Sequence, residues 1–273
     1  MNLSILASSG YGKSYITQAI AERNVDRYDH VVLLDYKDEY RGLCSKDHGP
    51  APFKNWMAGP VELQVGPGKW AEMIEDNGHV VVARHPSQID NDEWREIAAA
   101  IVTAARHHVD GSTLIVLDEA HFLAPQAGSY PDPIKGLATT GRGEGNSAAW
   151  ITQRTAEIDK TVLGQSTARF VGGFTGDNDI RPFRDVLDYP AEAHISGGHD
   201  VPGLPDELHA EDEGAVSVRK WAERQPDGSK QVIDSEWIYS DDDGDSKRLR
   251  SAEAFAPECD HVGASGMQID LGL

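Results

Sequence analysis

The sequence contains little cysteine and no long apolar run. Its 273 residues include only two cysteines, Cys44 and Cys259, whose separation matches no metal or redox motif, so we expect free thiols in a reducing compartment. The first apolar stretch covers only residues 3–7, and no run reaches the roughly 18 residues that a membrane-spanning helix needs. We therefore expect a cytoplasmic protein with neither a membrane span nor a secretory signal.

Basic side chains are also scarce. The chain has 25 Lys and Arg against 45 Asp and Glu, a net charge of −20, whereas proteins that act on nucleic acid usually show a basic footprint. The acidic residues are spread along the chain and form clusters such as 211–213 and 241–243. This pattern favours a protein from a high-salt organism, because at about 1 M salt the Debye length is about 3 Å and self-repulsion is screened. An ordinary acidic cytosolic protein is the alternative.

Strand and helix signals alternate through the first two-thirds of the chain. Continuous apolar runs of four to six residues are typical of strands buried on both faces, and they alternate with helical periodicity, as in an α/β fold with a mostly parallel sheet flanked by helices. The sequence predicts strands at 2–7, 30–35, 61–65, 80–83, 114–117, 148–152 and 168–171, helices at 14–23, 91–108, 133–139 and 156–163, and β-like pieces at 215–221 and 232–239.

Composition divides the chain into three parts. Residues 1–190 are predicted to form the core, in which the Pro- and Gly-rich segment 41–68 is an insertion over the sheet edge. Residues 191–239 are predicted to form a small, irregular, β-containing appendage. Residues 240–273 are predicted to be a disordered acidic tail, because Asp, Ser and Gly dominate there and few large apolar side chains offset the entropy of ordering.

Residues 7–14, Ala-Ser-Ser-Gly-Tyr-Gly-Lys-Ser, fit the Walker A pattern with alanine in place of the usual first glycine. They follow a predicted strand and open a predicted helix, so backbone N–H groups can surround the β-phosphate of ATP, where the helix dipole also favours negative charge. Lys13 is expected to reach the β- and γ-oxygens, and the Ser14 hydroxyl to ligate Mg²⁺. The predicted nucleotide contacts are Ser9, Gly10, Tyr11, Gly12, Lys13, Ser14 and Tyr15.

Residues 114–119 fit a Walker B element, in which a buried strand delivers two carboxylates at its end. Asp118 is predicted to hold Mg²⁺ through water, while Glu119 orients and polarises the attacking water. An acidic pair that merely caps the next helix is the alternative, and the Walker A segment disfavours it.

Two further polar residues are candidates for catalysis. Gln153 follows the strand 148–152, so its amide is predicted to sense the γ-phosphate or the lytic water; a plain turn glutamine is the alternative. Arg142 lies in a glycine-rich loop and is predicted to reach the nucleotide of a neighbouring subunit, where it stabilises transition-state charge. A surface salt bridge or a DNA phosphate contact are the alternatives for Arg142, and Arg154 or Arg169 are alternatives for its role.

These motifs resemble the FtsK–HerA superfamily of DNA-pumping P-loop ATPases, which have a RecA-like (ASCE) core. The resemblance covers about residues 1–190 and is carried by the Walker A segment, Asp35-Tyr36-Lys37-Asp38-Glu39-Tyr40, Leu117-Asp118-Glu119-Ala120-His121 and Ile151-Thr152-Gln153-Arg154. A compact core of this kind is most similar to genome-packaging ATPases of membrane-containing archaeal viruses. The resemblance implies a homo-hexameric ring that threads double-stranded DNA. Its partner would be a viral capsid vertex or membrane protein, in the host cytoplasm or the virion.

Other functions fit parts of the same pattern. A host HerA-like helicase or a conjugation-type ATPase is the nearest alternative. Residues 118–121 also spell a DEAH box, but such helicases need two RecA-like domains, so His121 is interpreted as an ordinary residue of the loop after the strand. A nucleotide-dependent switch or small-molecule kinase would use the same cradle, although the sequence shows neither an Asn-Lys-x-Asp base reader nor an arginine-rich lid.

Overall fold

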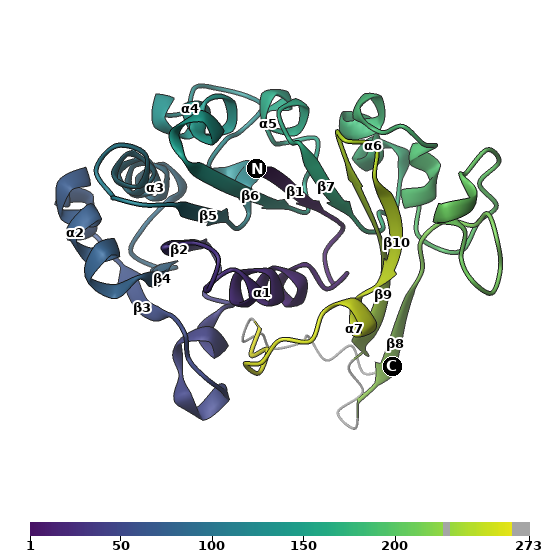
Figure 1. The fold of residues 1–273 in the computed structure, drawn as a ribbon, viewed down its shortest axis with the longest axis horizontal. Coiled ribbons are helices and arrows are strands. Elements are labelled where there is room, and N and C mark those ends of the chain that lie inside the picture. Colours follow the sequence, from purple (N-terminus) through teal and green to yellow (C-terminus); the bar gives the residue numbers. More distant parts are fainter. Residues whose placement is uncertain (226–229, 264–273) are drawn as a thin grey trace.

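The structure, a computed structural model, describes residues 1–225 and 230–263, which build a ten-stranded sheet with helices on both faces (Figure 1). The strand order is β10-β9-β7-β1-β6-β5-β2-β4-β3, and β8 pairs with β9. The strands are β1 Asn2–Leu6, β2 His30–Asp35, β3 Lys54–Ala58, β4 His79–Arg84, β5 Thr113–Leu117, β6 Asn146–Thr152, β7 Ala168–Val171, β8 Lys220–Arg224, β9 Lys230–Asp241 and β10 Ser246–Arg250.

The strands from β7 to β3 run parallel, so their carboxyl ends meet at one edge of the sheet. β1 lies between β6 and β7, and β5 lies between β6 and β2. Alternation along each strand sends successive side chains to opposite faces: Val32 and Leu34 pack into one hydrophobic cluster and Val31 and Leu33 into the other. This layout brings the segments that follow β1, β2, β5 and β6 to the same edge.

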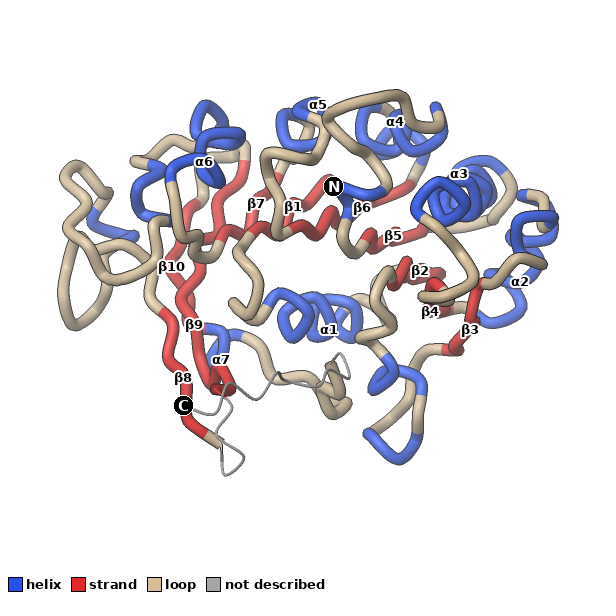
Figure 2. Tube along the Cα trace, turned by 180° about the vertical axis from the view of Figure 1, so that it is seen from behind, coloured by secondary structure: helices blue, strands red, loops and turns tan. Residues whose placement is uncertain are grey.

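The helices divide between the two faces. Figures 1 and 2 show α1 on one face and α3, α4 and α5 on the other, with β1, β6 and β5 between them. None of the described helices is both long and apolar enough to cross a bilayer. The helices are α1 Lys13–Arg23, α2 Pro67–Asn77, α3 Asn91–His107, α4 Asp132–Thr139, α5 Lys160–Gly164, α6 Asp177–Ile180 and α7 Ser251–Ala254.

Most predicted elements of the core are confirmed within a residue or two, but the segment 41–68 differs from its prediction. The predicted strand at 61–65 is wrong, because Glu62–Gln64 forms a 3-10 turn. The strand of this segment is instead β3, which pairs in parallel with β4 and forms the edge of the sheet. The helix α2 was not predicted, and the helix predicted at 156–163 is shorter, since α5 begins after the Asp159 N-cap.

The C-terminal part of the chain also differs from the prediction. β9 and β10 fall partly or wholly in the predicted disordered tail, yet they pair antiparallel, and β9 extends the main sheet by pairing with β7. Trp237, Ile238 and Phe255 are buried against α1 and β7, which supplies apolar burial that composition alone does not reveal. Residues 264–273 of the predicted tail lie outside the described residues.

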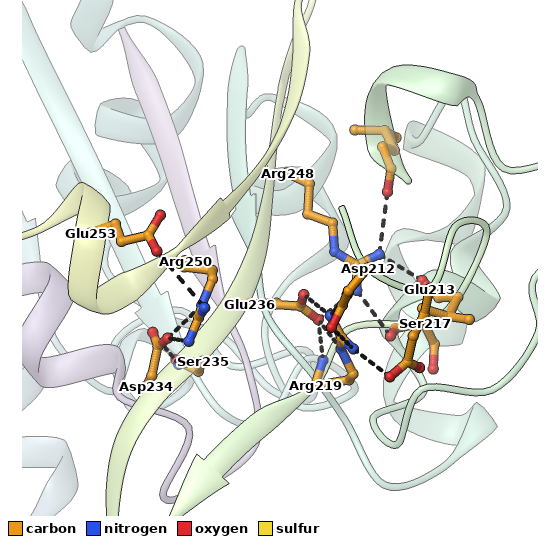
Figure 3. Close-up of polar contacts among 12 residues, drawn as sticks. Asp212, Glu213, Ser217, Arg219, Asp234, Ser235, Glu236, Arg248, Arg250 and Glu253 are labelled. Carbon is orange, nitrogen blue, oxygen red and sulfur yellow. Dashed lines mark hydrogen bonds and ion pairs between the residues drawn. The ribbon is translucent and has the colours of Figure 1, made fainter. Parts of the chain in front are cut away.

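Charged side chains add to this order (Figure 3). Glu236 on β9 accepts from Arg219 at 2.8 Å and also from Arg248 on the neighbouring strand β10. Arg250 pairs with Asp234, again between β10 and β9. A hollow of about 490 Å³ lies beside this network. The guanidinium groups of all three arginines already contact carboxylates. We therefore interpret the network as one that stabilises the C-terminal strands, not as a ligand-binding site.

Candidate active site

Segments from five parts of the chain line one cavity of about 240 Å³ at the carboxyl edge of the sheet. This is below the roughly 300–1,000 Å³ of a pocket for a drug-sized ligand, so its size suits the phosphates rather than a whole nucleotide. Predicted site residues in its lining are Ser9, Gly10, Gly12, Lys13, Ser14, Asp118, Glu119 and Gln153, and they are joined by Lys37, Glu39, His261 and Gly263.

The loop between β1 and α1 has the backbone shape of a phosphate cradle. Gly10 has φ 65° and Gly12 has φ 92°, conformations that residues with a Cβ rarely adopt. The Lys13 ammonium donates to the Ser8 carbonyl at 3.0 Å. Burial lowers the pKa of Lys13 to about 8, although the carboxylates of Glu119 and Asp118 act in the opposite direction. An anion bound in the cradle would further favour the charged form of this lysine.

The two tyrosines among the predicted nucleotide contacts direct their side chains elsewhere. Tyr11 is fully buried against Trp237, with ring centroids 5.5 Å apart, and its hydroxyl donates to the Arg219 carbonyl at 2.9 Å. The Tyr15 hydroxyl donates to the Phe255 carbonyl at 2.9 Å. Both side chains therefore anchor the cradle to the C-terminal part, and contacts between their backbone N–H groups and phosphate stay a prediction.

The Walker B carboxylates lie at the end of β5, as predicted. Asp118 and Glu119 are 5% and 3% exposed. Burial, followed by the charges of Glu119, Asp35 and Glu39, raises the pKa of Asp118 well above its ordinary range. Within the described chain, Asp118 Oδ2 has no hydrogen-bond partner. Asp118 and Ser14 line the same cavity, and an unpartnered carboxylate oxygen together with a hydroxyl supplies the oxygen donors that Mg²⁺ prefers, so the residues fit this ion.

Glu119 is held by several neighbours. Its Oε1 accepts from Gln153 Nε2 at 2.8 Å and also from the Lys37 ammonium. His121, predicted to be an ordinary loop residue, is 3% exposed, with Nδ1 3.0 Å from Thr152 Oγ1 and 3.3 Å from Glu119 Oε2. The backbone of Glu119 has φ 46°, a left-handed conformation that costs a non-glycine residue about 1–3 kcal/mol and is typical of functional sites.

Lys37 is the main site residue to which the sequence assigned no role. Asp35, at the end of β2, is fully buried and accepts from the backbone N–H groups of Lys37, Glu39 and Tyr40 at 3.0–3.2 Å. Asp35 thereby shapes the loop that directs Lys37 into the cavity. The segment 35–40 carries part of the family resemblance, and the place of β2 beside the Walker B strand is the signal that identifies Lys37 as a site residue.

The C-terminal segment reaches the same cavity. His261 Nε2 lies 3.5 Å from Ser14 Oγ, and His261 Nδ1 lies 3.1 Å from Gln18 Oε1. Gln18 also donates to the carbonyl of Cys259 at 2.8 Å. Because His261 and Ser14 are far apart in sequence, no local pattern indicates this contact. Both Cys44 and Cys259 are free thiols, as predicted.

Arg142 does not reach the cavity of its own chain. It is exposed and precedes β6, whereas Gln153 follows β6. The seven residues of β6 put about 20 Å between these two points. Burial, and then the charge of Arg142, lowers the pKa of the Met1 amino group, which places Arg142 near the opposite edge of the sheet. A catalytic role for Arg142 therefore requires a second subunit.

The two alternative arginines are engaged to different degrees. Arg169 is buried, donates to the Ser166 carbonyl at 2.7 Å and pairs with Asp242 at 3.0 Å, so it is not available to a neighbouring subunit. Arg154 is exposed and pairs with Glu157 at 2.7 Å.

Comparison with known proteins agrees with this geometry. Residues 1–97 match the family model for the central domain of helicase HerA. This match agrees with the predicted resemblance to the FtsK–HerA superfamily. No curated protein sequence matches significantly. Among solved structures, the chain is similar to the genome packaging NTPase B204 from Sulfolobus turreted icosahedral virus 2 in complex with ATP-gammaS. The two are 15% identical, the match covers 94% of this chain and 97% of that chain, and the TM-score is 0.55.

Two solved proteins of other origin share the fold. The bacterial conjugative coupling protein TrwBdeltaN70 is 10% identical to this chain, with 97% and 88% of the two chains covered and a TM-score of 0.52. VirB4 of Thermoanaerobacter pseudethanolicus is 14% identical, with 71% and 82% covered and a TM-score of 0.50. These likenesses confirm the predicted fold class, a mostly parallel P-loop ATPase sheet flanked by helices.

Proposed function

We propose that this protein hydrolyses ATP and uses the energy to move double-stranded DNA. The observation that carries the proposal is the convergence of the predicted groups Lys13, Ser14, Asp118, Glu119 and Gln153 on one cavity. They come from the ends of adjacent parallel strands and from a glycine-shaped loop. This combination supports phosphoryl transfer to water.

Each residue has a distinct part in this reaction. The N–H groups of the cradle and the Lys13 ammonium bind the phosphates, and Glu119 accepts a hydrogen bond from the attacking water and orients it. Gln153 holds Glu119 in place from the next strand. Mg²⁺, held by Ser14 and by Asp118 through water, would neutralise charge on the phosphate oxygens.

The coupling to DNA and the viral setting are supported by the comparison with a solved structure. The match to the B204 packaging NTPase extends over nearly the whole of both chains, which supports genome packaging as the process. Arg142 is too far from the cavity of its own chain to act there. In a homo-hexameric ring, Arg142 of one subunit would reach the cavity of the next. The partners would be double-stranded DNA and a capsid vertex or membrane protein, and the host a high-salt archaeon whose salt screens the charge of −20.

The test of this proposal is an ATPase assay in molar KCl, with and without duplex DNA, combined with a mass measurement of the assembly. We expect hydrolysis that rises with duplex DNA, that depends on Mg²⁺, and that comes from a ring. Lys13→Ala serves as the inactive control. Hydrolysis that ignores DNA at every salt concentration, in a protein that remains a monomer, would contradict a DNA motor and favour a switch or kinase.

A conjugation-type or host translocase is the second candidate, because TrwBdeltaN70 matches 97% of this chain. Recovery of the protein from purified virions, or bound to a capsid or membrane protein of a virus, supports packaging. Its association with a cellular chromosome or a plasmid, in cells free of virus, supports the second candidate.

A further inference from the structure

A second lysine lines the phosphate cavity together with Lys13. Lys37 lies just past the end of β2, and its ammonium contacts Glu119 Oε1. We propose that Lys37 is a γ-phosphate sensor: it pairs with Glu119 when the cavity lacks a γ-phosphate and moves to that phosphate when ATP binds, which releases Glu119 to bind water. This inference rests on the proposed ATPase function and adds a residue that discriminates ATP from ADP.

The contacts of Glu119 correspond to the state without a γ-phosphate, in which Lys37 pairs with Glu119. One carboxylate oxygen, Oε1, accepts from both Lys37 and Gln153, and a carboxylate oxygen has about two lone pairs to share. The other oxygen, Oε2, lies 3.3 Å from His121 Nδ1 and is buried away from solvent, without a hydrogen-bond partner in the described chain. Water has no free position on Oε1 while Lys37 and Gln153 remain there. Departure of Lys37 therefore frees a position on Oε1 from which Glu119 can orient the attacking water.

The cavity also supplies a reason for Lys37 to leave. Lys13 and Lys37 both line it, and the charge of Lys37 contributes, after burial, to the lowered pKa of Lys13. Two cations that repel each other in one small cavity are stabilised together by a polyanion. The cradle and Lys13 contact the β-phosphate of ATP or ADP alike. The γ-phosphate is present in ATP and absent from ADP, and its negative charge competes with Glu119 for the Lys37 ammonium.

Lys37 is built to change partners while its backbone stays fixed. Three backbone N–H groups of its loop donate to Asp35, and Asp38 holds a left-handed conformation with φ 59°. The Lys37 side chain is 38% exposed, and its flexible four-carbon stem carries three donors that can reorient. Lys13, in contrast, is held by the Ser8 carbonyl. Only the Lys37 side chain therefore needs to move when the γ-phosphate arrives.

The experiment compares the binding of ATPγS and ADP, with Mg²⁺, by the wild-type protein, Lys37→Met and Lys37→Arg. We expect Lys37→Met to weaken ATPγS binding about 10-fold, equivalent to about 1.4 kcal/mol, and to change ADP binding less than about 2-fold. Lys37→Arg, which keeps the charge, should retain most of the preference for ATPγS. Lys69→Met is the matched control, since Lys69 is exposed, pairs with Glu72 and is not part of the cavity lining.

A second measurement separates sensing from a purely structural role. Glu119→Gln removes the carboxylate charge that competes for Lys37, so it should tighten ATPγS binding and leave ADP binding unchanged. In the Lys37→Met background the same substitution should have no effect on either nucleotide, because no ammonium remains to be released.

The outcomes separate the two proposals. Equal changes in ATPγS and ADP binding by Lys37→Met, or no change in either, overturn the sensor role while the ATPase function stands. Tightening of ATPγS binding by Glu119→Gln that persists in Lys37→Met also overturns it. A wild-type protein that binds neither nucleotide overturns the proposed function, and the sensor role with it.

Discussion

Gln153 Nε2 lies 2.8 Å from Glu119 Oε1, although 34 residues separate them in the chain. The two residues follow the adjacent parallel strands β6 and β5, which pair in register from Asn146 to Trp150. Because parallel strands end at the same edge, this register brings an amide donor to a buried carboxylate. The position of Glu119 thus depends on the sheet as much as on its own loop.

Replacing Glu119 with glutamine should stop turnover without weakening nucleotide binding. The amide is similar in size but accepts a proton from water far less readily, and general-base groups contribute about 10²- to 10⁴-fold to rates. Steady-state hydrolysis and ATPγS binding measured on the same preparation check this prediction. Glu157→Gln, at an exposed salt bridge, should retain activity. Parallel loss of hydrolysis and binding in Glu119→Gln would argue against its assignment.

Asp118→Asn should make the nucleotide-free protein more stable and the enzyme inactive. In the free site the Asp118 carboxylate is buried beside Glu119 and Asp35, and its raised pKa means that its ionised form is disfavoured. A neutral amide removes that repulsion. Each kcal/mol regained raises Tm by about 2–4 °C. Thermal unfolding with EDTA should show this increase, and Mg²⁺ with ADP should stabilise the wild-type protein more than the variant. A lower Tm in EDTA would refute the prediction.

Asp35 should give folding stability a pH dependence with an unusual sign. Burial raises its pKa from 3.8 to about 7, although the N–H groups of Tyr40 and Glu39 oppose the shift. Between these values the folded protein keeps a proton that the unfolded chain has released, so the free energy of unfolding falls as pH rises, by up to about 1.4 kcal/mol per pH unit.

Denaturant unfolding of Asp35→Asn and wild type across this pH range, at constant salt, measures the effect. The amide cannot titrate, so the stability of the variant relative to wild type should rise as pH increases from about 4 to about 7. A difference that stays constant with pH would show that Asp35 is ionised throughout.

Arg142→Ala should lower hydrolysis strongly in a uniform ring, since arginines supplied in trans contribute about 10³-fold or more. Mixing this variant with Lys13→Ala subunits, which keep Arg142 but have a disabled cradle, should restore hydrolysis at the interfaces where the two meet. ATPase activity as a function of the mixing ratio is the measurement. If no ratio exceeds the activity of either variant alone, Arg142 does not act in trans.

Gln18→Ala should loosen the C-terminal segment from α1. Gln18 donates to the Cys259 carbonyl at 2.8 Å and contacts His261 Nδ1 at 3.1 Å. Hydrogen exchange measured by mass spectrometry should show faster exchange in residues 255–263 and unchanged exchange in β5 and β6. Arg27→Ala, on the turn after α1, is a control. Unchanged exchange at 255–263 would mean that other contacts hold the segment.

Local sequence predicted the core elements well where a strand is buried on both faces or a helix is buried along one stripe. β2 and β5 are apolar runs buried on both faces, and α3 carries an apolar stripe, so period and hydrophobicity suffice for each. β3 escaped prediction because it is an exposed edge strand with little apolar pattern. The predicted β-like piece 232–239 lies within β9, whereas β10 was missed for a different reason: it pairs with β9, which is itself held by β7 and α1 from earlier parts of the chain.

The cradle and the Walker B carboxylates could be assigned from sequence because their chemistry resides in contiguous residues. Glycine at 10 and 12, lysine at 13 and a buried strand ending in two acids are each local requirements of phosphate and metal binding. The contacts of Lys37 with Glu119 and of His261 with Ser14 could not be assigned in this way. They join segments whose separation along the chain carries no signal, and only the order of strands in the sheet and the path of the C-terminal segment bring them together.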